Sequence, residues 1–222
     1  GNNLGIKNAQ IAYMTSKNPL GPFTYQGVMF KNTAEMGLDK GGNNHHSLVY
    51  FKNNYYLLYH ARQVENRMGY NLNYRSPHID LASFSNGKIS VNGSLKGVSQ
   101  IETLNPYNKV QAETIAQMAG VTTRGLGDTV VTDISKGDWI KVKGAEFSKG
   151  ASSLKVKASS KSGCVIKVCA GGPSGKVLTY IEVPAGGSMT EIDTPVVGDV
   201  SGTTDITFVF NGDAEFDWWS FS

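Results

Sequence analysis

Apolar and polar residues alternate along much of this chain, and no segment repeats its apolar positions with the period of a helix. No long stretch is free of glycine, proline or β-branched residues. Turn signals such as KNPLGP, KNN and SNG separate the alternating segments. The pattern predicts an all-β protein. Its predicted strands in the first part of the chain are Gln10–Thr15, Phe23–Met29, Ser47–Phe51, Tyr55–His60, Ile79–Phe84 and Ile89–Val91.

A change of composition near residue 100 predicts two domains. Residues 1–96 hold all the histidines, residues 97–108 have the composition of a linker, and residues 109–222 are rich in Val, Gly, Ser, Thr and Lys. Short strands spaced by about ten residues in the second domain predict a β-sandwich or jelly roll. Those strands are Lys109–Glu113, Val130–Ile134, Asp138–Val142, Ser153–Ala158, Gly163–Ala170, Lys176–Val183, Thr190–Val196, Thr204–Phe210 and the final FDWWSF.

Charge and composition narrow the classes of partner. The net charge is only +3 and the basic residues are scattered, so nucleic acid is not an expected partner. No stretch of 18 apolar residues is present, so no membrane span is expected, and no signal peptide is recognisable in this chain. Cys164 and Cys169 lie in one predicted strand, too far apart along it to bridge, and are expected to be free buried thiols without a metal.

The histidines suggest a polar pocket in the first domain. All of them, at positions 45, 46, 60 and 78, lie in the first 80 residues. His45 and His46 precede a predicted strand, and adjacent strand residues point to opposite faces, so one is expected to face a core and the other a cavity or solvent. The alternative is that both are ordinary hydrogen-bonding residues at a strand entrance.

Three phrases of the first domain resemble a known enzyme family. IAYMTSKNPLGPFTYQGVMFKN, GGNNHHSLVYFKNNYYLLYH and YRSPHIDLASFSNGKI resemble the second half of a glycoside hydrolase family 43 domain. The resemblance implies the last blades of a five-bladed β-propeller that cleaves arabinofuranosyl or xylosyl linkages. It also implies a substrate pocket that includes His45, His46 and Arg75. The alternative for Arg75 is a salt bridge between blades.

The resemblance places the catalytic carboxylates of the family upstream of residue 1. An inverting glycosidase needs an acid and a base about 6.5–9.5 Å apart. The first hundred residues contain only Glu35, Asp39, Glu65 and Asp80, and none lies in a phrase that matches the acid or base of the family. The chain alone is therefore expected to be inactive. Residues 1–100 are expected to depend on the second domain, on a missing N-terminal half or on a second chain that completes the propeller.

The second domain resembles a family 6 carbohydrate-binding module. The resemblance runs over about residues 107–222 and depends on QAE, KGDWIKV and the final DWW. It implies a structural Ca²⁺ bound by Gln111, Glu113 and Asp217, with a hydrogen-bonded polar cluster as the alternative.

The sugar-binding residues of such modules are altered in this chain. The resemblance puts Asp133 and Ser188 where aromatic residues often lie, and Glu215 near the usual asparagine. Tyr180 is a further candidate platform, on an open sheet face. Trp139 is expected in the core, while Trp218 and Trp219 are expected to point to opposite faces. A module that has lost its ligand and supports the propeller is the alternative.

Together, these features predict part of a secreted glycosidase that degrades plant cell-wall polysaccharides. The expected activity is that of an arabinofuranosidase or β-xylosidase acting on xylan, arabinoxylan or arabinan. The expected partner is a plant polysaccharide or oligosaccharide, and the expected location of the whole protein is extracellular or periplasmic. A non-catalytic carbohydrate-binding or structural module is the alternative.

Overall fold

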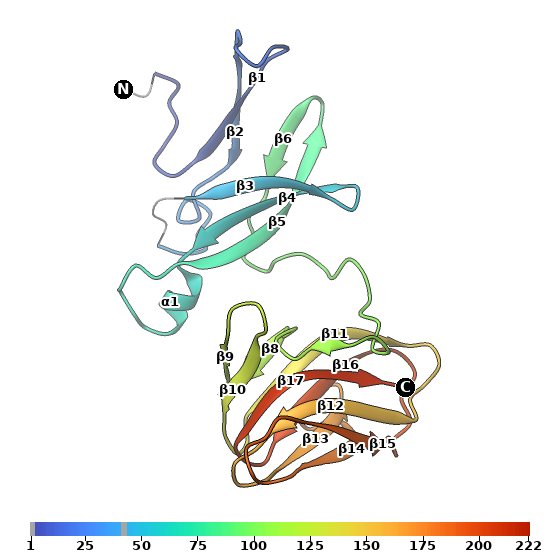
Figure 1. The fold of residues 1–222 in the computed structure, drawn as a ribbon. Coiled ribbons are helices and arrows are strands. Elements are labelled where there is room, and N and C mark those ends of the chain that lie inside the picture. The colour runs from blue at the N-terminus through green and yellow to red at the C-terminus, as the bar shows by residue number, and fades with distance from the viewer. Residues whose placement is uncertain (1–2, 41–43) are drawn as a thin grey trace. The chain divides into compact units, whose positions relative to one another are not determined.

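A computed structural model describes residues 3–40 and 44–222. The chain forms two compact units, residues 1–101 (unit 1) and residues 102–222 (unit 2), which are described separately below (Figure 1). Strands dominate both units, as the alternating sequence predicts. The described residues contain no helix that is both long and apolar enough to span a membrane.

Unit 1 consists of a two-stranded and a four-stranded antiparallel sheet. The first sheet pairs β1 (Ile11–Thr15) with β2 (Thr24–Phe30). The second has the order β3-β4-β5-β6, the meander expected of a propeller blade. Its strands are β3 (His46–Phe51), β4 (Asn54–Ala61), β5 (Ser76–Ser85) and β6 (Lys88–Val91).

Two tight turns set the register of this meander. Lys52 and Asn53 both have positive φ, as do Asn86 and Gly87. Two successive residues with positive φ suit a two-residue hairpin turn, whose twist matches that of the strands. The KNN and SNG signals in the sequence thus correspond to the β3–β4 and β5–β6 turns.

Both faces of the β3–β6 sheet are apolar. One face carries Leu57, Tyr59, Ala82 and Val91, which are buried in a core with β1 and β2 residues including Phe30. The opposite face carries apolar residues that remain exposed. They are Val49, Phe51, Leu58 and Leu81. An antiparallel sheet with one solvated face alternates apolar and polar residues, so this sheet has the sequence of one that is covered on both sides.

Unit 2 is a sandwich of two antiparallel sheets. The first has the order β15-β12-β17-β10-β9, with β7 also paired to β17, and the second has the order β14-β13-β16-β11-β8. The strands are β7 (Val110–Gln111), β8 (Gln117–Ala119), β9 (Thr122–Arg124), β10 (Val130–Ile134), β11 (Trp139–Phe147), β12 (Ser153–Ser159), β13 (Cys164–Ala170), β14 (Lys176–Val183), β15 (Thr190–Pro195), β16 (Gly202–Phe210) and β17 (Ala214–Phe221).

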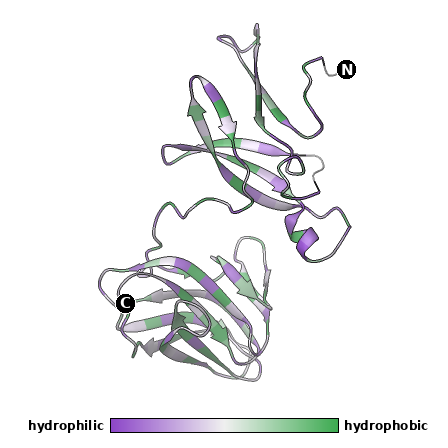
Figure 2. Ribbon diagram, turned by 180° about the vertical axis from the view of Figure 1, so that it is seen from behind, coloured by the Kyte–Doolittle hydropathy of each residue, from purple (hydrophilic) through white to green (hydrophobic). Residues whose placement is uncertain are grey.

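Aromatic side chains fill the space between the two sheets. The ring of Phe208 lies 5.1 Å from that of Phe216 and 5.5 Å from that of Trp219, and all three are fully buried. Figure 2 shows hydrophobic residues recurring along the strands of this unit and of unit 1. Because the apolar residues of each sheet face the other sheet, unit 2 has a core of its own.

The tryptophans divide between the core and the outer faces. Trp219 lies in the core, whereas Trp218 is on the opposite face of β17, where the Lys109 ammonium is 5.0 Å from its ring. The predicted opposite orientation of these two residues is confirmed. Trp139 is half-buried and lies outside the core cluster, so the expectation of core packing was wrong for this residue.

Three further features differ from the sequence predictions or extend them. A short helix, α1 (Gln63–Arg67), interrupts the otherwise all-β chain. The short strands β8 and β9 were not predicted. Leu104, in the predicted linker, pairs with Ala145 of β11, so the second half of that linker belongs to the sandwich. Cys164 and Cys169 are free and buried, as predicted.

Candidate functional site

A polar cavity of about 350 Å³ lies at one end of the strands of unit 1. The residues around it precede β1, follow β2, precede β3, lie at or just after the end of β4, or precede β5. These chain ends meet at one edge because neighbouring strands are antiparallel. The lining residues are Ala9, Asn32, Thr33, Asp39, Asn44, His60, Ala61, Arg62, Asn73 and Arg75.

The histidines separate at this edge as the strand geometry requires. The backbone N–H of His45 approaches Nδ1 of His60 at 3.4 Å, and the two rings lie 5.3 Å apart. His60 lines the cavity, so His45 is adjacent to it. His46 is paired with Tyr59, which in turn is paired with His78, and this face leads to the core. His46 is thus on the opposite face of the sheet from His60, and it is not among the residues that line the cavity.

Arg75, which the resemblance assigned to a substrate pocket, lines the cavity and lies just before β5. Asn32, Thr33, Asn44 and Asn73 were not predicted as site residues. Each lies at or near a strand end, next to an apolar strand segment. A polar residue at such a position was the available sequence signal, but sequence alone did not show that these ends converge.

Asp39 joins two segments of the cavity wall. Its carboxylate accepts hydrogen bonds from the Thr33 hydroxyl and from the backbone N–H of Arg62, the latter at 2.7 Å. The loop that follows β2 is therefore tied to the end of β4. Asp39 is engaged in this structural role on both of its oxygens.

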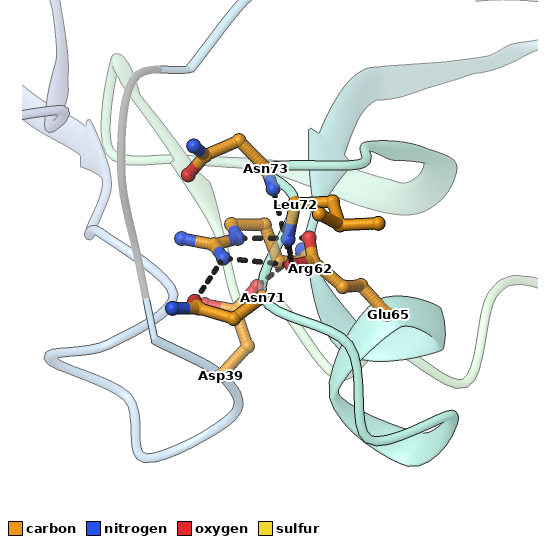
Figure 3. A network of polar contacts seen from close by, with 6 residues as sticks. All are labelled: Asp39, Arg62, Glu65, Asn71, Leu72 and Asn73. Atoms are coloured by element: carbon orange, nitrogen blue, oxygen red, sulfur yellow. Dashed lines mark hydrogen bonds and ion pairs between the residues drawn. The ribbon is translucent and has the colours of Figure 1, made fainter.

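Glu65 and Arg62 form a second, buried charged network beside the cavity (Figure 3). Oε1 of Glu65 accepts hydrogen bonds from the backbone N–H groups of Leu72 (2.6 Å) and Asn73 (3.1 Å) and from Nη2 of Arg62 (2.9 Å). Oε2 accepts from Nε of Arg62 at 3.1 Å, and Arg62 also donates to Asn71. Hydrogen bonds from Arg62 and from the two backbone amides lower the pKa of Glu65 to about 2.

The remaining two acidic residues of unit 1 are also engaged. Glu35 accepts a hydrogen bond from Gln10 (2.8 Å) and pairs with Lys7 (3.1 Å). Asp80 is buried and accepts hydrogen bonds from the hydroxyls of Tyr59 (2.6 Å) and Ser94 (2.8 Å). Burial, together with the bond to Asp80, raises the pKa of Tyr59.

A second cavity, of about 390 Å³, lies in unit 2 and contains two of the predicted sugar-binding residues. Asp133 and Glu215 both line it, together with Lys161 and Asp213. No aromatic residue is among its lining residues in the part of the chain that the structure describes. Glu215 is paired with Arg124, and Asp133, which has a φ of 55°, accepts a hydrogen bond from the Thr122 hydroxyl. This cleft is thus lined by charged and small polar side chains and by no aromatic ring among the described residues.

Tyr180 lies on the outer face of the other sheet and is 54% exposed. The strand register places it opposite Lys167, which is opposite Val209, which is opposite Trp139. Directly paired residues share a face, so Tyr180 and Trp139 belong to one row across this sheet.

The predicted metal ligands lie where β7 meets β17. The N–H of Ala112 donates to the backbone oxygen of Asp217 at 2.8 Å, which brings Glu113 to the same end of the sheet. Oδ2 of Asp217 is 2.8 Å from Nζ of Lys157, whereas Oδ1 of Asp217 and Oε2 of Glu113 are buried without a hydrogen-bond partner. Among the described residues, no three His, Cys, Asp or Glu side chains form a metal-binding group.

Comparisons with known proteins agree with both resemblances. Residues 111–222 match the family described as carbohydrate binding module (family 6). An arabinoxylan arabinofuranohydrolase of Paenibacillus polymyxa is 40% identical over 217 residues, 91% of this chain, and one of Bacillus subtilis (strain 168) is 40% identical over 232 residues, 96% of this chain. The chain spans 34% and 45% of the length of these relatives.

A solved structure extends the similarity to three dimensions. The crystal structure of a glycoside hydrolase family 43 arabinoxylan arabinofuranohydrolase from Bacillus subtilis, in complex with cellotetraose, has a TM-score of 0.90 and is 39% identical. The match covers 96% of this chain and 47% of that protein. It supports the assignment of unit 1 as part of a propeller and of unit 2 as the sandwich module.

Proposed function

The chain belongs to the family 6 carbohydrate-binding modules through residues 111–222, and from this premise we propose that it is part of a family 43 glycosidase that removes arabinofuranosyl groups from arabinoxylan. Two relatives that match more than nine-tenths of the chain carry the name of that activity. The chain spans less than half of either relative, so this proposal assigns the remainder of the enzyme to blades outside these 222 residues.

The observation that carries this proposal is a cavity lined by polar groups that can bind sugar hydroxyls, in a unit whose carboxylates are all engaged in hydrogen bonds or ion pairs. Arg75, His60 and Asn73 offer donors and acceptors for sugar hydroxyls. All the carboxylates of unit 1, at positions 35, 39, 65 and 80, are held by hydrogen bonds or ion pairs within the unit. An inverting hydrolase needs an acid and a base on opposite sides of the sugar. Unit 1 thus supplies substrate contacts, while the catalytic pair lies on other blades.

Hydrolysis of 4-nitrophenyl α-L-arabinofuranoside and of arabinoxylan tests this division of labour. A longer protein that contains these 222 residues together with the other proposed blades is called the complete polypeptide below. It is expected to release arabinose, with inversion at the anomeric carbon visible by NMR. The 222-residue chain is expected to be inactive, and an Arg75→Ala variant of the complete polypeptide is expected to lose at least about tenfold in kcat/KM, because a guanidinium fork contacts paired hydroxyls. Hydrolysis by the 222-residue chain would instead make Glu35, Asp39, Glu65 and Asp80 the candidates for catalysis.

We also propose that further blades of the same polypeptide cover the exposed face of the β3–β6 sheet. Val49, Leu58 and Leu81 line this face, and sheets with two apolar faces are normally buried on both sides. A second chain is the other possible source of this cover. Sedimentation of the complete polypeptide distinguishes the two sources, because cover by its own blades predicts a monomer and cover by a second chain predicts a dimer.

In unit 2 we propose a structural Ca²⁺ held by Gln111, Glu113 and Asp217. The support is that two buried carboxylate oxygens, one of Glu113 and one of Asp217, lack a donor, which is costly unless a cation neutralises them. Calcium binds several oxygen ligands at once, which these side chains offer. The ammonium of Lys157 already contacts the other oxygen of Asp217 and reduces the net negative charge of the site.

Thermal unfolding of the 222-residue chain with EDTA or with CaCl2 tests the calcium site. Calcium is expected to raise the melting temperature of unit 2 by mass action, and Asp217→Asn is expected to abolish the increase. Asp193→Asn, at an exposed position on the edge strand β15 of the same sheet, removes the same charge and is the control. A melting temperature that calcium leaves unchanged would contradict the site and favour a hydrogen-bonded polar cluster.

We propose that sugar binding by unit 2 depends on the outer face around Tyr180, and that the loop cleft of Asp133 and Glu215 contributes little. An exposed tyrosine offers the flat apolar surface on which a sugar ring packs. The cleft has no such surface among its lining residues, and its Glu215 is paired with Arg124.

Affinity electrophoresis of the 222-residue chain in soluble arabinoxylan separates these surfaces. Tyr180→Ala is expected to weaken retardation by about tenfold, and Glu215→Ala to leave it unchanged. Wild-type migration that the polysaccharide does not retard would instead favour a module with a purely structural role. Because the polymer cannot enter a cell, we propose that the enzyme acts outside the cytoplasm.

A further inference from the structure

The segment that carries Asn73 and Arg75 into the cavity has little packing of its own. Its larger side chains are exposed, with Tyr70 at 47%, Leu72 at 60% and Tyr74 at 58%. Asn73 also has a φ of 62°, a conformation that a residue with a Cβ adopts at some cost. Hydrophobic burial therefore does not explain why this loop keeps one conformation. We attribute that conformation to its hydrogen bonds.

Glu65 supplies most of those hydrogen bonds. Its carboxylate accepts the backbone N–H groups of Leu72 and Asn73, and its backbone oxygen accepts the N–H of Tyr70 at 3.1 Å. The Glu65 side chain is almost fully buried, although it belongs to a short helix at the surface. A buried carboxylate is costly unless its oxygens are all matched by donors, and here the donors come from the loop and from Arg62.

Arg62 extends this link to a second segment that lines the cavity. Its guanidinium donates to both oxygens of Glu65 and to Oδ1 of Asn71, while its backbone N–H donates to Asp39. In Figure 3 the guanidinium lies between Asn71 and the Glu65 carboxylate. Two loops that line the cavity, around Asp39 and around Asn73, are thus attached to one residue at the end of β4.

We propose that Glu65 is a positioning residue for the substrate cavity: by holding the backbone of Leu72 and Asn73, together with Arg62, it sets the placement of Asn73 and Arg75 toward the sugar. Glu65 itself touches no substrate in this arrangement, because its oxygens are occupied by the loop and by Arg62. The proposal rests on the proposed function for its sugar ligand, whereas the attachment of the loop is a property of the chain alone.

The test compares Glu65→Gln with the wild type in the complete polypeptide. The amide keeps the size of the side chain but replaces one acceptor oxygen with a donor, which then faces another donor. We expect hydrogen exchange in a peptide covering residues 68–75 to accelerate by about tenfold or more, while β4 and β5 remain protected. We also expect KM for arabinoxylan to rise about 10- to 100-fold with a much smaller change in kcat, because displaced Asn73 and Arg75 bind the sugar less well.

Asp80→Asn is the matched control, since Asp80 is also a buried carboxylate of unit 1 but contacts Tyr59 and Ser94 rather than the loop. A purely structural role lowers the fraction of folded enzyme, which reduces the apparent kcat and leaves KM unchanged. We expect that pattern for Asp80→Asn. Arg62→Lys keeps the positive charge but loses the paired N–H donors of the guanidinium. Its exchange rate in residues 68–75 and its KM are expected to lie between those of Glu65→Gln and the wild type.

The outcomes separate this proposal from the proposed function. Unchanged exchange in residues 68–75 of Glu65→Gln would overturn the positioning role, whether or not the enzyme acts on arabinoxylan. Faster exchange with an unchanged KM would also overturn the positioning role, because releasing the loop from Glu65 would then have no effect on sugar binding. If the wild type cleaves no arabinofuranoside, the proposed function fails. The positioning role is still supported in that case if Glu65→Gln shows both faster exchange in residues 68–75 and weaker retardation in arabinoxylan gels.

Discussion

The sandwich of unit 2 and the β3–β6 sheet of unit 1 are both antiparallel, but their apolar faces have different surroundings. In unit 2, each sheet covers the other, and Phe208, Phe216 and Trp219 are fully buried between them. In unit 1, one sheet face packs against β1 and β2, while Val49 and Leu81 on the other remain exposed. Apolar patterning on both faces therefore marks a sheet that needs additional layers, whereas a closed core marks a unit that folds independently.

Separating the units is the strongest way to break this comparison. Residues 102–222 alone are expected to unfold cooperatively and to give a near-ultraviolet circular dichroism signal from packed aromatic rings. Residues 1–101 alone are expected to aggregate or to lack that signal, because their exposed apolar face and sheet edges lack cover. A monomeric residue 1–101 fragment with a cooperative transition would show that unit 1 requires no further layer.

Removing one core ring sharpens the comparison within unit 2. Trp219→Ala is expected to lower the free energy of unfolding by about 3–5 kcal/mol, because the cavity left between the sheets cannot collapse fully. Tyr180→Ala, which removes an exposed ring from the same unit, is expected to change it by less than about 0.5 kcal/mol. Urea denaturation monitored by circular dichroism measures both, and similar losses for the two variants would contradict a core centred on Trp219.

A polar substitution on the exposed face of the β3–β6 sheet is expected to change stability in the complete polypeptide but not in the 222-residue chain. Leu81→Gln is expected to reduce the stability of the complete polypeptide by about 1–3 kcal/mol, because it buries an amide against further blades. In the 222-residue chain the same change is expected to improve solubility and to leave stability nearly unchanged, since Leu81 is exposed there. Equal effects of Leu81→Gln in the two proteins would show that nothing covers this face.

The smallest expected effect is the pH dependence of the loop anchor. The pKa of Glu65 is lowered from 4.5 to about 2 in the folded chain, so its contribution to stability is fully present above pH 4.5 and is lost as the pH falls toward 2. The difference in stability between the wild type and Glu65→Gln is therefore expected to be constant from pH 7 to 4.5 and to shrink below. Urea titrations at each pH measure this difference, in which contributions from His78 cancel because both proteins contain it. A difference that already shrinks between pH 7 and 5 would contradict this origin.

Much of the fold was predictable because each strand carries its own local signal. Val130–Ile134 and Lys176–Val183 were predicted with the bounds that the structure has. Helix α1 was missed because a helix of one turn is too short to show a period, and β8 and β9 were missed because three exposed residues show no alternation. Trp139 was placed in the core because the sequence could not show which face of β11 the sandwich covers.

The candidate site was predictable only in part. Of the residues that the sequence pointed to, Arg75 and His60 line the cavity. The sequence could not assign His45 and His46 to separate faces, because a shift of one residue exchanges the two faces of a strand. Nothing in the sequence around Asp39 and Glu65 indicates their structural roles. Their donors, at Thr33, Arg62 and Leu72, approach through folding of loops rather than through any sequence motif.

Local periodicity, composition and motif order are enough to establish that this protein is built from β-strands, that it divides near residue 100, and which family phrases it carries. The tertiary structure decided which polar strand ends converge on one cavity and which acidic side chains are already engaged by donors. It also decided which apolar face remains exposed. Those properties depend on the register and packing of segments far apart in the chain, and no local pattern encodes the distance between them.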